Sequence, residues 1–106
     1  MANYLLAYHG GGMPSTPAEQ AKVMEAWGQW FGSLGAAVVD GGNPVAQAST
    51  IAANGSVSNG GGANPVSGYS IIKADSLEAA VSLAKGCPII GSGGGSIEVC
   101  ETFQAM

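Results

Sequence analysis

"GYSIIKADSLEAAVSLAKGCP", residues 68–88, decides the fold, because it predicts a strand followed directly by a helix. YSIIKA is a short apolar run of the kind that forms a strand. Asp75 and Glu78 form a capping-box pattern at the start of a helix. Gly86 and Pro88 end that helix, since glycine and proline follow helix ends. One face of the helix is expected to carry Leu77, Ala80, Val81 and Ala84.

A second strand and helix precede this unit. Residues 3–9 alternate, which predicts a strand with Tyr4, Leu6 and Tyr8 on one face and Leu5, Ala7 and His9 on the other. After the glycines at 10–12, Thr16 is the expected N-cap, Pro17 the first helical residue and Glu19 the partner in a capping box. The apolar stripe of this helix contains Val23, Trp27, Trp30, Phe31 and Leu34, and Gly35 ends it in a left-handed conformation.

The remaining segments complete a β-α-β-β-α-β order. Residues 36–39 predict a short strand, QASTIAA an edge strand, and residues 54–68 a glycine-rich hairpin or loop. The last strand is expected at residues 96–103. We therefore predict one domain, residues 1–106, with an α+β, ferredoxin-like fold: a four-stranded antiparallel sheet with two helices on one face. Because the other face is also apolar, we expect two sheets to meet in a homodimer.

Composition narrows the range of partners. The chain has 46% hydrophobic residues, 18 glycines, no arginine and a net charge of −4. So few cations disfavour nucleic acid and anionic membrane surfaces as partners. No apolar run approaches the length that spans a bilayer, and we expect a cytoplasmic protein in which Cys87 and Cys100 are free thiols.

The pieces YLLAYHGGG, AEQAKVMEAWGQWFGSLGAAVVDGGNP, GYSIIKADSLEAAVSLAKGCP and GGSIEVCETF, in this order, resemble the YCII-related proteins of the dimeric α+β barrel superfamily. The likeness covers nearly the whole chain. It implies a homodimer with facing sheets, a cleft in each protomer, and a His and an Asp that work together, here His9 and Asp40. One branch of the family carries an Asp-Gly-Pro-Phe run before the third strand, where this chain has GGGANPVSGY.

His9 and Asp40 are accordingly the expected catalytic residues, at the ends of strands that we expect to be neighbours. A neutral imidazole takes up a proton near pH 7, and a carboxylate on its other nitrogen fixes the tautomer. The alternative is that His9 ends a strand and Asp40 is a turn residue. Around them, Tyr8, Tyr69, Gly10 and Gly11 are the expected substrate-binding residues, through hydroxyl and backbone N–H groups.

Three functions stay open. The first, which the resemblance favours, is a cofactor-independent lyase or isomerase acting on a small carbonyl or ring compound. The second is a non-catalytic module that binds a small ligand, and the third is a structural dimer without a ligand. No cofactor is expected, and a metal site is the weaker possibility, because His9, Asp40, Glu98 and Glu101 lack ligand spacing.

Overall fold

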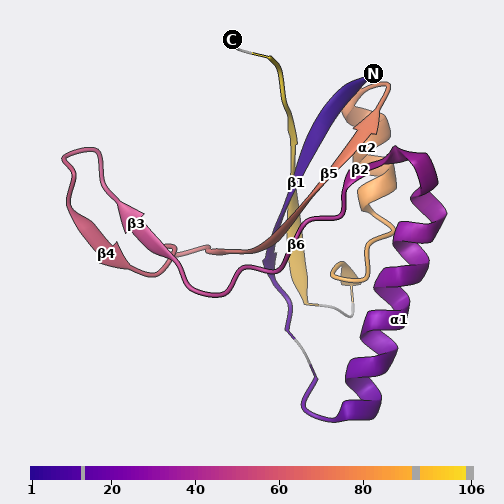
Figure 1. Cartoon of the computed structure of the whole chain (residues 1–106), viewed down its shortest axis with the longest axis horizontal. Helices are drawn as coiled ribbons and strands as arrows, with labels where there is room; N and C mark the ends of the chain where they lie inside the picture. Colours follow the sequence, from indigo (N-terminus) through magenta and orange to yellow (C-terminus); the bar gives the residue numbers. More distant parts are fainter. Residues whose placement is uncertain (13, 92–93, 105–106) are drawn as a thin grey trace.

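A computed structural model describes residues 1–12, 14–91 and 94–104 and has an α+β architecture (Figure 1). A four-stranded antiparallel sheet carries two helices, and a separate two-stranded hairpin lies away from it. The elements in chain order are β1 (Ala2–Gly10), α1 (Pro17–Leu34), the 3-10 helix η1 (Gly35–Ala37), β2 (Val38–Asp40), β3 (Ser49–Ile51), β4 (Val57–Asn59), β5 (Val66–Ala74), α2 (Leu77–Ala84) and β6 (Gly95–Glu101).

The strand order of the main sheet is β2-β5-β1-β6, and every neighbouring pair is antiparallel. Both helices lie on the same side of this sheet (Figure 1), which is broadly compatible with the predicted ferredoxin-like fold. The expectation that the strands carrying His9 and Asp40 are neighbours is wrong, because β5 lies between β1 and β2. The two neighbours of β5 are β1 and β2, and β2 forms an edge of the sheet.

Most helix signals are confirmed, with two corrections. α1 begins after Thr16, whose side chain accepts a hydrogen bond from the Glu19 backbone N–H at 3.3 Å. Gly35 ends it at a φ of 56°, but its ψ of −125° lies outside the left-handed helical region that we expected. α2 is capped by Ser76 rather than by Asp75, and the Ser76 hydroxyl accepts from the Ala79 N–H at 3.1 Å.

The segment between β2 and β5 differs from the prediction. The QASTIAA strand is not an edge of the main sheet, because β3 pairs only with β4 in its own two-stranded sheet. The second strand also begins later than predicted, since Gly35–Ala37 forms a 3-10 turn. Residues 45–64, which we call the arm, project from the side of the sheet opposite to the helices (Figure 1).

The core fills the space between the sheet and the helices. Alternate residues of β1 and β5 face it, and Trp30 closes it from α1. The Trp30 indole Nε1 donates a hydrogen bond to the Leu83 carbonyl at 3.0 Å, which ties α1 to α2. The buried core residues are Tyr4, Leu6, Tyr8, Trp30, Ile72, Ala74, Ala80, Ala84, Cys87 and Ile89.

The opposite face of the sheet, which we call the open face, has no helix over it (Figure 1). The register pairs Leu5 with Ile71 and Ala7 with Tyr69, so these four apolar or aromatic side chains form two adjacent rows. All four are half-buried, in contrast to the buried rows on the helix side. Over the described residues, neither helix is long and apolar enough to cross a membrane.

Candidate functional site

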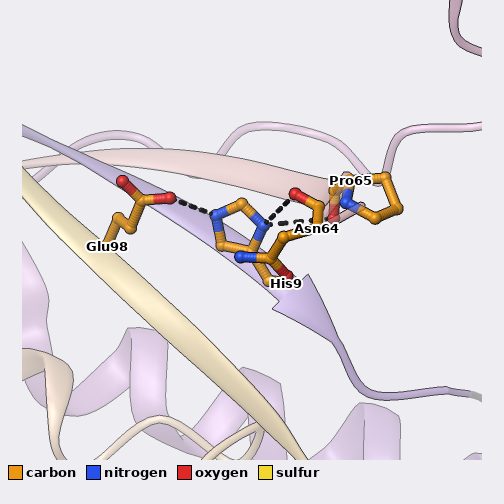
Figure 2. Close-up of polar contacts among 4 residues, drawn as sticks. All are labelled: His9, Asn64, Pro65 and Glu98. Carbon is orange, nitrogen blue, oxygen red and sulfur yellow. Dashed lines mark hydrogen bonds and ion pairs between the residues drawn. The ribbon is translucent and has the colours of Figure 1, made fainter. Parts of the chain in front are cut away.

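His9 lies near the end of β1 on the open face, where the register between β1 and β5 shifts. Opposite Tyr8 and His9, β5 has an extra residue, and such a bulge redirects neighbouring side chains. The His9 side chain is 4% exposed although no helix covers it. Figure 2 shows the reason: the ring lies between Glu98 of β6 and the chain at Asn64 and Pro65, which leads into β5.

The contacts of the imidazole determine where its protons are. Nδ1 lies 3.1 Å from the carbonyl oxygens of both Asn64 and Pro65, and because a carbonyl oxygen only accepts, Nδ1 carries a proton. Nε2 lies 2.6 Å from Oε1 of Glu98 without the alignment of a hydrogen bond. The His9 ring thus has two backbone carbonyl oxygens on one side and the Glu98 carboxylate on the other.

Asp40 has a different environment from the one expected. It is exposed at the end of β2, and its Oδ1 accepts a hydrogen bond from the Gly42 N–H at 2.8 Å, as in an Asx turn. On β5, Asp40 pairs with Ile71 and His9 with Val66. Five residues along a strand correspond to about 16 Å, so the two side chains are not partners. Their expected contact is wrong, while a catalytic role for either residue stays a prediction.

A cleft of about 780 Å³ lies on the other side of the sheet from His9, beside α1. This volume is within the range of pockets that hold small organic molecules. Aromatic side chains form much of its wall: the Tyr8 and Trp27 rings meet edge to face with centroids 5.2 Å apart, and the Trp27 and Phe31 centroids are 6.0 Å apart. Lys22 is the only charged residue among the described residues that line the cleft.

All four residues expected to bind substrate are lining residues of this one cleft, namely Tyr8, Gly10, Gly11 and Tyr69. Their binding role stays a prediction: Tyr69 lines the cleft although its ring belongs to the open face of β5, and His9 and Asp40 lie outside the lining. The Tyr69 hydroxyl accepts a hydrogen bond from the Asn43 side-chain amide at 3.4 Å.

Two hydrogen bonds in the cleft wall join β1, β5 and the loop that follows β2. The Tyr8 hydroxyl donates to Ser70 Oγ at 2.8 Å, and the Ser70 hydroxyl donates to the Gly41 carbonyl at 2.7 Å. Burial raises the pKa of Tyr8 to about 12, even though the bond to Ser70 acts in the opposite direction. The phenol is therefore neutral at physiological pH and holds the loop after β2 against the sheet.

The backbone conformation of that loop depends on Gly42. Its φ is +75°, and a Cβ added there would lie 2.6 Å from the Tyr69 carbonyl carbon and closer still to the carbonyl oxygen. Only glycine permits both this conformation and this approach. The loop and β5 thus meet backbone to backbone at the edge of the cleft.

The roles of several residues around His9 and in the cleft were not predicted. Glu98 was considered only as a metal ligand, although its alternation on the last strand already placed it on the face opposite Ile97 and Val99. The adjacency of β6 and β1 was the missing step. Trp27 and Phe31 were predicted only as part of an apolar helix stripe, and they both pack against the core and line the cleft, two roles that helical spacing does not distinguish.

Within the part of the chain that the structure describes, no group of three His, Cys, Asp or Glu residues has the geometry to hold a metal ion. Cys87 is free and buried, and Cys100 is free and exposed. Burial raises the pKa of the Cys87 thiol to about 11, so it is not a reactive thiolate at neutral pH.

No protein-family model matches the chain, and no curated protein or solved structure is significantly similar to it.

Proposed function

We propose that this chain binds a small ring compound in the cleft beside α1. The observation that carries the proposal is the cleft itself, with about 780 Å³ and a wall formed by Tyr8, Trp27 and Phe31. Small-molecule sites are typically apolar, aromatic and concave, with a few polar groups that fix orientation. The hydroxyl of Tyr8 and the backbone of the loop after β2 supply such groups here.

Binding is tested by calorimetry and thermal shift with a panel of aromatic and alicyclic compounds. Ala26 lines the cleft and is half-buried, so Ala26→Phe should occupy the ligand's space and abolish binding. Ala21 is exposed on the same helix and is not a lining residue, so Ala21→Phe is the matched control and should bind normally. If no compound binds the wild-type protein, or if Ala26→Phe binds as well as Ala21→Phe, the proposal is wrong.

Binding without chemistry suits this cleft better than the lyase or isomerase activity implied by the YCII resemblance. That activity would use His9, but His9 is not a lining residue of the cleft, and its Nδ1 is hydrogen-bonded to backbone carbonyls. Turnover of a bound compound, lost in His9→Ala, would instead establish the enzymatic alternative.

We also propose that two copies pair through the open face, as in a dimeric α+β barrel. The chain exposes 6955 Å², whereas a compact monomer of 10.4 kDa exposes about 5,400 Å². The excess of about 1,550 Å² per chain is of the size that a subunit interface covers. The radius of gyration, 15.1 Å, likewise exceeds the ~13 Å expected for a compact chain of this length.

The apolar rows of the open face and the arm both support a second copy as the partner. The arm is a two-stranded hairpin with Ile51 and Val57 directly paired and mostly exposed, and such a hairpin is marginally stable without further packing. A copy seated on the open face would lie on the side to which the arm projects (Figure 1).

Sedimentation or light scattering at micromolar concentration tests the pairing, with about 21 kDa expected instead of 10.4 kDa. Leu5→Lys on the open face should give the smaller species, and Gln29→Lys on the exposed side of α1 should not. A wild-type protein that stays at the smaller mass would refute the proposed dimer.

A further inference from the structure

The proton of the Tyr8 hydroxyl takes part in a hydrogen bond within the protein. It donates to Ser70 Oγ, whose own proton goes to the Gly41 carbonyl, so the direction of this chain of bonds is fixed by an oxygen that only accepts. Tyr8, Ser70 and Gly41 are all lining residues of the cleft. The Tyr8 oxygen therefore has lone pairs to offer a ligand and no proton. A ligand that bonds to it must bring a hydroxyl or an N–H.

The charge at the cleft restricts the ligand further. Lys22 is the only charged residue among the described lining residues, and no carboxylate lies among them. Glu19 and Glu25 lie three residues before and after Lys22 on α1, but among the described residues neither forms an ion pair with it, so the ammonium favours an anionic group on the ligand. Lys22 is exposed, so this group would lie at the mouth of the cleft and its attraction would be partly screened by solvent.

The spacing of these groups sets the size of the ligand. Lys22 precedes Trp27 by five residues on α1, which is about 7.5 Å along the helix axis and about 140° around it, so the two side chains leave the helix in different directions. The Trp27 ring is also the edge-to-face neighbour of Tyr8. Because all three residues line the cleft, a ring beside Trp27 and Tyr8 needs a side arm to bring an anionic group to Lys22.

We propose that the ligand is a hydroxylated ring carboxylate, with its ring against Trp27 and Phe31, its hydroxyl donating to the Tyr8 oxygen and its carboxylate beside Lys22. This inference rests on the proposed binding function of the cleft and names the chemistry that the same cleft selects.

Four probes of one shape separate the two polar contacts. They are 4-hydroxyphenylacetate, phenylacetate without the hydroxyl, 4-methoxyphenylacetate without the donor proton, and the neutral 2-(4-hydroxyphenyl)ethanol. The dissociation constants are measured by calorimetry at low and high salt. We expect 4-hydroxyphenylacetate to bind about three- to tenfold more tightly than the two acids without a donor, the usual effect of one hydrogen bond. We expect its affinity to exceed that of the neutral alcohol by about two- to fivefold at low salt and by less at high salt.

Two pairs of variants assign each contact to its residue. Tyr8→Phe should remove the advantage of the hydroxyl, whereas Tyr4→Phe, on the same face of β1 but not a lining residue, should keep it. Lys22→Met should remove the advantage of the carboxylate, whereas Lys85→Met, at the end of α2, should keep it. Because Lys22 is exposed, its replacement leaves the fold intact and keeps the test decisive.

The possible outcomes separate the inference from the function on which it rests. If all four probes bind with equal affinity, or if Lys22→Met and Lys85→Met behave alike, the ligand class is wrong and the binding function stands. If none of the probes binds while other ring compounds do, the ligand class is also wrong. If no ring compound binds at all, the proposed function fails together with it.

Discussion

Replacing Gly42 by alanine tests the closest backbone approach in the protein. The substitution places a methyl group 2.6 Å from the Tyr69 carbonyl carbon, at a φ of +75°. The left-handed conformation alone costs an alanine about 1–2 kcal/mol. The Tyr69 carbonyl oxygen lies closer still, so the loop after β2 must also move from β5 by nearly 2 Å before the atoms reach ordinary contact of ~3.5 Å.

That movement disrupts the hydrogen bonds that join the loop to β5. The Tyr69 N–H donates to the Asn43 carbonyl at 3.2 Å, and the Ser70 hydroxyl to the Gly41 carbonyl at 2.7 Å. Each such bond contributes about 1 kcal/mol. We therefore expect Gly42→Ala to lower the free energy of unfolding by about 3–4 kcal/mol, and the melting temperature by about 12 °C or more.

Gly91→Ala is the matched control, because Gly91 also has a φ of +75° but no atom of the described residues within 4 Å of the added Cβ. It should lose only the conformational part, about 1–2 kcal/mol. Urea unfolding followed by tryptophan fluorescence measures both values. A loss of stability in Gly42→Ala within about 0.5 kcal/mol of that in Gly91→Ala, smaller than one hydrogen bond, would refute the reasoning.

Three further predictions concern protonation and the core. The pKa of Tyr8 is raised to about 12 and that of Cys87 to about 11, so each group stabilises the fold below its unfolded pKa, 10 and 9 respectively, and loses this contribution as pH rises through the folded value. The free energy of unfolding measured in urea should accordingly decline between about pH 9 and 12, and it should decline less steeply in Tyr8→Phe. If the decline with pH is equally steep in the variant, it does not come from Tyr8. Trp30→Phe removes the hydrogen bond to the Leu83 carbonyl and part of a buried ring, and should lower the free energy of unfolding by about 1–3 kcal/mol in chemical denaturation. In long-range ¹H–¹⁵N spectra at neutral pH, Nδ1 of His9 should be protonated, because it faces two carbonyl oxygens; an unprotonated Nδ1 would show that this contact is absent in solution.

The strands and helices could be predicted because their signals are local. The alternation in residues 3–9 and the Thr16–Pro17 helix start predicted β1 and the beginning of α1, since both depend on neighbours along the chain. The cap of α2 was misplaced by one residue because Asp75 and Ser76 are both good N-caps. In the arm, QASTIAA was predicted as an edge strand and residues 54–68 as a hairpin or loop, because β3 and β4 lack a pattern that shows which sheet they join.

The candidate site depended on strand order, which local patterns do not contain. The prediction that His9 and Asp40 meet assumed that their strands were adjacent, but β5 separates them, and His9 contacts Glu98 and the carbonyls of Asn64 and Pro65 instead. The gathering of Tyr8, Gly10, Gly11 and Tyr69 at one cleft was predictable as a set, because they lie at the same end of β1 and β5.

By itself, the sequence determined the identity and order of the main strands and helices, and the face on which each β1 residue lies, because the periods of strands and helices are properties of the backbone. Only the tertiary structure decided that Glu98 is the neighbour of His9, that Trp27 and Phe31 border a cleft, and that Gly42 must be glycine. The physical reason is that these contacts join residues far apart in the chain. They arise only when packing has fixed the order and register of the strands.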